Sequence, residues 1–251
     1  MSRLRLLGTM TWVELRLFVR EPITLIFALA MPLVMLFVLG EVFGNTPETD
    51  EVIFRGVGAM DYYVPAYVGL TLASFGVLAL PVHLAAYREH GVLRRFHASS
   101  VPLWAILGAQ VVVMLAIATV GSLVMVAVAM PLYDTDLPRS AAGVLGAYLL
   151  SALSFAALGV LLGALLPTAR AAQGVGIMLF FVMLMLGGAG PPPEVVTGPL
   201  RVVGDVLPLT YVARLLQDPW LGFAWDAGTI AFVAGVTVAA GVGAAIGFRW
   251  E

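Results

Sequence analysis

The chain has 251 residues, of which 61% are hydrophobic and only 11% are charged, and its mean hydropathy is +1.01. Soluble domains are about half apolar and about a quarter charged, so this composition excludes an ordinary soluble protein. The formal net charge is -2 and the basic residues are scattered, which excludes the basic patch that a nucleic-acid partner would need. Cysteine is absent, which excludes disulfides, thiolate metal sites and cysteine nucleophiles.

The first 21 residues predict an amphipathic helix that lies along a membrane surface. At helical spacing, polar residues and Trp12 share one face, and leucines with Phe18 share the other. Glu14 falls on the apolar face, where a charged carboxylate needs a partner. The alternative is a short polar segment without defined structure.

The hydrophobic stretches that follow predict six transmembrane helices, because about 20 apolar residues cross a bilayer. They cover residues 22–43, 62–84, 102–132, 141–166, 171–188 and 226–248. We therefore expect an all-α membrane protein with a single transmembrane domain. Tyr62, Tyr63 and Tyr67 are expected to form an aromatic belt at the membrane interface.

Residues 189–225 have a different character from the spans around them. Consecutive prolines at 191–193 are followed by a mildly apolar stretch, which Arg201, Asp205, Pro208 and Arg214 interrupt. Such a segment cannot cross lipid unaided, because its backbone and charges would lack partners there. It is predicted to be a surface or re-entrant helical hairpin on the outer side, either packed on protein or lying at the membrane interface.

The distribution of arginine predicts the orientation, since basic loop residues are retained in the cytoplasm. Nine arginines fall on one side of the predicted topology and four on the other. The richer side contains both termini and residues 85–101, which are predicted to be a cytoplasmic loop with a short helix at 87–98. We therefore expect a multi-pass protein of the plasma membrane with both termini in the cytoplasm.

The predicted spans contain no ionisable residue near their middle, which disfavours an ion-coupled transporter. Gln110 and Gln173 are expected to form interhelical hydrogen bonds. Two Gly-xxx-Gly pairs, at 159–163 and 243–247, are expected to pack helices within the chain. The cytoplasmic loop carries His83, His90 and His97 with few possible co-ligands, so no metal is expected there.

All 13 basic residues are arginine. Without lysine the chain cannot form a P-loop, which needs a lysine to reach the nucleotide phosphates. We expect no enzymatic activity and no cofactor in this chain. Any ATP, with its Mg²⁺, must be bound by a partner.

Three stretches, from Glu14 to Gly44, from Tyr87 to Pro102 and from Pro208 to Leu216, resemble the ABC-2 type permeases, the membrane subunits of one class of exporters. The first combines Glu14, Arg16, Arg20, Pro22 and Pro32 with Phe43 and Gly44, and is similar to the entry helix and first span of that family. The second is the loop from Tyr87 to Arg95 with Pro102 after it. The third is Pro208-Leu209-Thr210-Tyr211 with Leu215 and Leu216. Gly188 to Pro193 depart from the family pattern.

The resemblance implies a dimer of permease chains, identical or paralogous, bound to two ATP-binding subunits in a bacterial inner membrane. By size the chain is similar to drug and antibiotic exporters such as the daunorubicin-resistance type. The residues implied to couple to the ATPase are Tyr87, Arg88, Glu89, Gly91, Leu93, Arg94 and Arg95. Those implied to line a substrate cleft are Tyr63, Tyr67, Phe75, Phe180, Phe181 and Met183. Those of the outer gate and hairpin are Gly188, Pro191, Pro208, Thr210 and Tyr211.

Apolar and aromatic cleft residues predict an amphipathic or hydrophobic cargo, such as a drug, an antibiotic or a lipid-like compound. Two other functions remain open at this point. One is a membrane channel or an assembly or regulatory protein without an ATPase, and the other is an intramembrane enzyme. The second is disfavoured by the lack of a nucleophile with its base.

Overall fold

The computed structural model describes residues 3–19, 22–47, 53–98 and 101–247. Within these residues 83% of the chain is helical and no strand occurs, as the sequence predicts. The elements are α1 (Arg3–Val19), α2 (Pro22–Phe43), η1 (Phe54–Gly56), α3 (Ala59–Ser74), the π-helical turn η2 (Phe75–Ala79), α4 (Leu80–Glu89), α5 (Val92–Ala98), α6 (Leu103–Tyr133), α7 (Ala141–Leu165), α8 (Ala169–Leu186), α9 (Pro199–Val206), α10 (Pro208–Leu221) and α11 (Ala227–Gly247).

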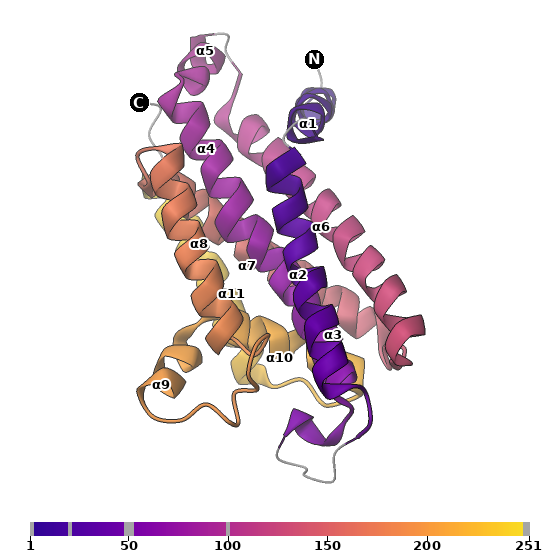
Figure 1. The fold of residues 1–251 in the computed structure, drawn as a ribbon. Coiled ribbons are helices and arrows are strands. Elements are labelled where there is room, and N and C mark those ends of the chain that lie inside the picture. Colours follow the sequence, from indigo (N-terminus) through magenta and orange to yellow (C-terminus); the bar gives the residue numbers. More distant parts are fainter. Residues whose placement is uncertain (1–2, 20–21, 48–52, 99–100, 248–251) are drawn as a thin grey trace.

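The long helices form one bundle, and the short elements gather at its two ends (Figure 1). α1 and α5 lie at one end, and η1, α9 and α10 lie at the other. α1 is seen nearly end-on in Figure 1, so it runs across the bundle rather than along it. We call these the α5 end and the α10 end.

Five helical stretches in the described residues are long and apolar enough to cross a membrane. They are Ala59–Glu89, Leu103–Tyr133, Ala141–Leu165, Ala169–Leu186 and Ala227–Gly247. The first predicted span coincides with α2, whose described apolar part, Leu29–Phe43, is shorter. The second predicted span extends beyond residue 84, because α3, η2 and α4 form one continuous helix. The chain is thus a multi-pass membrane protein.

This continuous helix occupies the centre of the bundle. Of its most hydrophobic 18 residues, 83% are buried, against 17–39% in the other four stretches. Tyr62, Tyr63 and Tyr67 lie inside this core with 1–2% of their surface exposed, so the predicted interfacial belt is wrong. Tyr62 and Tyr63 pack on Phe54, and Tyr63 also packs on Phe43 and Tyr67. The Tyr63 hydroxyl donates to the Gly190 carbonyl at 2.8 Å. A tyrosine whose hydroxyl has a protein partner needs no water interface.

Glycines allow the central helix to approach its neighbours closely. A Cβ at Gly159 of α7 would lie 2.4 Å from the Gly76 carbonyl oxygen, and one at Gly176 of α8 would lie 2.3 Å from that of Val77. Gly163 approaches Leu84 in the same way. The predicted packing of this Gly-xxx-Gly pair within the chain is therefore confirmed. The pair in α11 likewise packs on α7, near Leu161 and Leu165.

The predicted hairpin forms two helices of different burial. α9 exposes Leu200, Val202 and Val206, whereas α10 is buried along most of its length. α10 packs between α3, α7 and α11 at the α10 end of the bundle. It is therefore part of the protein core rather than a surface helix.

Candidate coupling site

The predicted coupling segment is not one helix, because the chain turns at His90 and Gly91. Gly91 has a φ of +65°, and its amide donates to the Arg88 carbonyl at 3.0 Å. A left-handed residue after the last helical turn is a common way to end an α-helix, and glycine adopts it without steric cost. Tyr87, Arg88 and Glu89 consequently form the end of α4, and Leu93 to Arg95 belong to α5.

Tyr87 connects α4 to α1. Its hydroxyl lies 3.1 and 3.0 Å from the two carboxylate oxygens of Glu14. Glu14 is 6% exposed, and burial raises its pKa although the Tyr87 hydrogen bond opposes that effect. The partner that was expected for Glu14 is therefore Tyr87 of α4, which lies 73 residues later in the chain.

Arg88 connects α4 to the end of α7. Its Nη1 atom donates to the carbonyl oxygens of Gly163, Ala164 and Leu166 at 3.1, 2.6 and 3.4 Å. The last carbonyls of a helix have no partner within the helix, and a cation there also interacts favourably with the helix dipole. Arg88 thus caps α7.

Glu89 connects α4 to the start of α8. Its Oε2 atom accepts a hydrogen bond from the backbone amide of Ala169, the first residue of α8, at 3.0 Å. A carboxylate at a helix N-terminus satisfies a free amide and complements the positive end of the dipole. Thr168 also caps this helix, with its hydroxyl accepting from Ala171 at 3.2 Å.

Three consecutive residues therefore bind three different elements. Successive side chains on an α-helix point about 100° apart, so three in a row cover most of its circumference. The end of α4 is in this way held to α1, to the end of α7 and to the start of α8. A displacement of the α4 terminus must move all three or break these contacts.

α5 follows the turn and presents charge outward. Leu93 is 1% exposed and anchors the helix, while Arg95 is exposed. The side chain of Arg94 lies outside the described residues. α5 and the Gly91 turn thus form an anchored, charged projection at the α5 end of the bundle (Figure 1).

The family comparison agrees with this architecture. The model of the ABC-2 type transporter family matches residues 5–219, which is most of the chain. The chain belongs to the ABC-2 type transporter family. Members are membrane components of ABC transporters and normally work with a separate ATP-binding subunit. A search of curated proteins gives no match.

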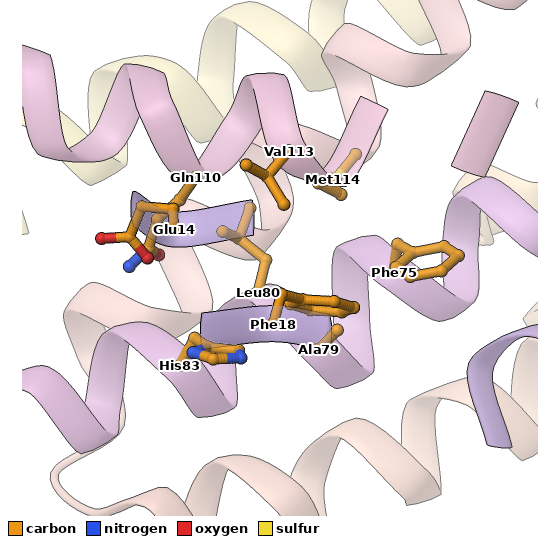
Figure 2. A pocket seen from close by; sticks show the side chains of 9 residues that line it. All are labelled: Glu14, Phe18, Phe75, Ala79, Leu80, His83, Gln110, Val113 and Met114. Atoms are coloured by element: carbon orange, nitrogen blue, oxygen red, sulfur yellow. The ribbon is translucent and has the colours of Figure 1, made fainter. Parts of the chain in front are cut away.

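A small cavity lies beside the Tyr87–Glu14 contact of this ABC-2 protein (Figure 2). Its volume of about 20 Å³ suits one water molecule. Glu14, His83 and Gln110 supply its polar groups, and Phe18 stacks on His83 with ring centres 5.3 Å apart. The Gln110 amide is near enough to lower the pKa of Glu14 slightly, but it reaches full hydrogen-bond geometry with none of the described residues. The predicted interhelical bond of Gln110 is thus incomplete.

The predicted cleft residues separate into two groups. Tyr63, Tyr67, Phe75, Phe180 and Met183 are each at most 4% exposed and belong to the core of the single chain. Phe181 is 45% exposed and lies on an open apolar face of α8 with Ile177, Met178 and Met185. A cleft wall made of the first group requires the helices around α3 to separate, whereas the second group is already accessible to a partner or lipid.

The predicted outer-gate residues connect α9, α10 and α11. The Thr210 hydroxyl donates to the Gly204 carbonyl at 2.6 Å, and the Tyr211 hydroxyl donates to that of Asp205 at 2.7 Å. Tyr211 also stacks on Phe232 of α11, with ring centres 3.7 Å apart. Pro208 starts α10, Gly188 has a φ of +84°, and Pro191 is exposed. Thr210 and Tyr211 thus fix the angle between α9 and α10.

Sequence reasoning missed two contacts at the α10 end. Arg55 forms an ion pair with Asp218 at 2.9 Å, and the Asn45 side-chain oxygen accepts the backbone amides of Met60 and Asp61 at the start of α3. Asn45 is an N-capping residue type, but it lies in a separate loop from the helix that it caps. Neither contact has a local sequence signal, because the partners are distant in the chain.

Proposed function

We propose that this chain is the permease subunit of an ATP-driven exporter, and that it moves an amphipathic or hydrophobic compound out of the cell. Two copies of a separate subunit bind ATP and Mg²⁺, and two permease chains form the pathway. The observation that carries the proposal is the end of α4, where Tyr87, Arg88 and Glu89 bind three elements beside the projecting α5. A motor that pushes on α5 acts on the whole bundle through this point.

The direction of force transmission follows from the chain. α5 is connected through the Gly91 turn to α4, and α4 is continuous with the buried central helix. The π-helical turn η2 lies where Gly159 of α7 and Gly176 of α8 meet the backbone of the central helix, at Gly76 and Val77. Single π-turns within α-helices often occur at functional sites. We place the conformational hinge of the transport cycle at η2.

The α5 end faces the cytoplasm in this proposal. Arg5, Arg16 and Arg95 lie on α1 and α5 at that end. Arg88 lies in the last turn of α4, which leads into α5, and Arg170 lies in the first turn of α8, which Glu89 of α4 contacts. Basic residues favour the cytoplasmic side. α1 then lies at the inner surface of a bacterial plasma membrane, with the exposed Trp12 under Arg16 at 4.7 Å. An ATPase in the cytoplasm meets α5 first.

The decisive experiment combines assembly with coupling. The permease is co-expressed with the ATP-binding protein encoded beside it, and the complex is purified and reconstituted into vesicles. We expect a stoichiometric complex whose ATP hydrolysis is stimulated by lipophilic compounds. Arg95→Glu on α5 should weaken ATPase binding at least tenfold, because a charged contact at an interface loses its partner. Arg170→Glu, an exposed arginine on α8, is the matched control.

Two results would contradict the proposal. A permease that purifies without any ATPase under these conditions is not an ABC subunit in function. An Arg95→Glu variant with wild-type binding and wild-type stimulated hydrolysis would show that α5 is not the docking element.

The cargo class has its own test in an adjacent pair of residues. Phe181→Ala alters an exposed side chain, so it should change which lipophilic compounds stimulate hydrolysis and leave thermal stability unchanged. Phe180→Ala removes a buried ring and should cost about 3–5 kcal/mol of stability. If Phe181→Ala leaves the compound spectrum of the exporter unchanged, the exposed face of α8 does not contact cargo.

A further inference from the structure

A second, larger cavity lies at the α10 end, opposite to the proposed ATPase site. Its volume is about 280 Å³, and it is lined mainly by polar surface. The charged and amide side chains in its wall are Arg55, Glu194, Arg214, Gln217, Asp218 and Asp226. These come from η1, from the segment before α9, from α10 and from the turn before α11. An apolar permease thus contains a highly charged cavity on its outer side.

One wall of the cavity contains an ion pair between Arg55 and Asp218. Asp218 is 3% exposed and binds Nη2 of Arg55 at 2.9 Å. The Arg55 guanidinium also lies over the Phe223 ring, 4.3 Å from its centre. Arg55 has a φ of +59°, a conformation that costs energy for a residue with a side chain. Its Nη1 is buried and hydrogen-bonded to none of the described residues.

Two further charges in the wall make no short contact, although the pKa of the Asp226 carboxyl is lowered by hydrogen bonds from Thr229 and also by the nearby positive charge of Arg214. Among the described residues, neither Arg214 nor Glu194 forms an ion pair or a side-chain hydrogen bond. Asp226 differs, because it accepts hydrogen bonds from Gly228 and Thr229 and so caps α11. Among the described residues, the Arg214 guanidinium and the Glu194 carboxylate therefore keep their hydrogen-bonding groups available to a ligand.

The charge balance selects the kind of ligand. The Arg55–Asp218 pair is neutral, and Asp226 is offset in part by the positive end of the α11 dipole. Arg214 also offsets part of the Asp226 charge, so the wall as a whole is weakly negative. The groups that remain for hydrogen bonds to a ligand are the Arg214 guanidinium and the Glu194 carboxylate, which are of opposite charge. A single ion would satisfy one of these and be repelled by the other, whereas a zwitterion matches both.

We propose that this outer cavity binds a small zwitterion, whose anionic group contacts Arg214 and Arg55 and whose ammonium contacts Glu194. A guanidinium group can form paired hydrogen bonds with either a carboxylate or a phosphate. The ligand is therefore either a free amino acid or the ethanolamine phosphate headgroup of a lipid in the outer leaflet. This site is separate from the transport pathway proposed for apolar cargo, and it does not depend on the ATPase.

The test is equilibrium binding to the purified full-length permease by isothermal titration calorimetry in detergent without phospholipid. The probes are alanine, glycerophosphoethanolamine, ethanolamine and inorganic phosphate. We expect at least one of the two zwitterions to bind at least tenfold more tightly than ethanolamine or phosphate. Whichever binds identifies the source, and repeating the titration in nanodiscs of phosphatidylethanolamine should abolish the signal only for a headgroup site.

Variants localise the site. Arg214→Gln and Glu194→Gln should each weaken zwitterion binding at least tenfold, and the double variant should lose it. Arg139→Gln and Glu41→Gln change exposed charges outside the cavity wall and serve as matched controls for folding and net charge. Glu194→Gln, Arg139→Gln and Glu41→Gln change exposed side chains and should show wild-type thermal stability within about 2 °C. Arg214 is half-buried, so the thermal stability of Arg214→Gln is measured alongside to separate loss of binding from loss of folding.

Three outcomes overturn the proposal. The absence of saturable binding by either zwitterion removes the site. Equal affinity for phosphate and the zwitterions makes it a plain anion site. Unchanged binding in Arg214→Gln and Glu194→Gln places the ligand elsewhere. None of these results bears on ATPase assembly, so the failure of this proposal and the failure of the exporter function are distinguishable.

Discussion

Replacing Arg88 by glutamine tests the connection between α4 and α7. The substitution removes the charge and the Nη1 donor that serves Gly163, Ala164 and Leu166. Only the contact with Ala164, at 2.6 Å, is short, and the one with Leu166, at 3.4 Å, is long. We therefore count one strong charge-assisted bond and a helix-dipole contribution rather than three full bonds.

The expected cost follows from that count. A hydrogen bond to a charged group contributes about 1.5–3 kcal/mol, and partial exposure of Arg88 reduces this to about 1–2 kcal/mol. In a chain of this length 1 kcal/mol shifts Tm by about 2–4 °C, so Arg88→Gln should lower Tm by about 2–8 °C. Arg88→Lys should fall between, because it retains the charge but not the geometry of the guanidinium.

The assay is thermal unfolding in detergent, followed by ATP hydrolysis and transport in vesicles that contain the whole complex. Arg170→Gln is the matched control, since it removes an exposed arginine at the same end of the bundle. We expect hydrolysis in Arg88→Gln to continue with a reduced yield of transport per ATP. A variant with the Tm and the transport yield of Arg170→Gln would refute the role of Arg88 as a connection.

Three further predictions concern the same end and the topology. Glu14→Gln should raise Tm at pH 7.5 and flatten the dependence of Tm on pH above 4.5. Burial raises the pKa of Glu14, so the wild-type protein loses stability as pH rises through that raised pKa, and glutamine does not titrate. An unchanged pH profile would show that the Glu14 carboxyl does not cause this loss. Gly91→Leu should cost about 1–2 kcal/mol of stability and uncouple ATP hydrolysis from transport. Gly91→Asn should retain wild-type stability and coupling, because asparagine tolerates positive φ. Equal loss of coupling in both variants would indicate that any side chain at this position blocks the partner. The chain has no cysteine, so single cysteines can report the topology. In intact cells, Asp136→Cys should react with a membrane-impermeant thiol reagent, and Ala98→Cys should not. The reverse pattern would invert the topology.

Helix locations were predictable because they depend on local hydropathy. An apolar run of about 20 residues forms a membrane helix almost regardless of its neighbours. The demand of Glu14 for a partner was predictable for the same reason, since one helical face places it among apolar residues. That the partner is Tyr87 was not predictable, because periodicity gives the face of a helix and not the helix that covers it.

The tyrosines show where local reasoning fails. Tyr62, Tyr63 and Tyr67 are amphipathic, and at the end of a predicted span this favours an interface. The fold instead satisfies the Tyr63 hydroxyl with the Gly190 carbonyl, 127 residues away. The cavity at the α10 end was invisible for a similar reason, because Arg55, Glu194 and Arg214 lie in three separate segments that only the fold brings together.

Both proposed sites act on the central helix. At the α5 end, Tyr87, Arg88 and Glu89 hold its terminus to three neighbouring elements. At the α10 end, Gln217, which lines the charged cavity, donates to the Tyr62 carbonyl near the start of that helix at 3.1 Å. If the ligand and the ATPase each bind one position of the central helix better than another, each changes the affinity of the permease for the other. Thermodynamic linkage requires that the two factors are equal. Zwitterion affinity measured with and without the bound ATPase therefore reports whether the two ends of the permease move together.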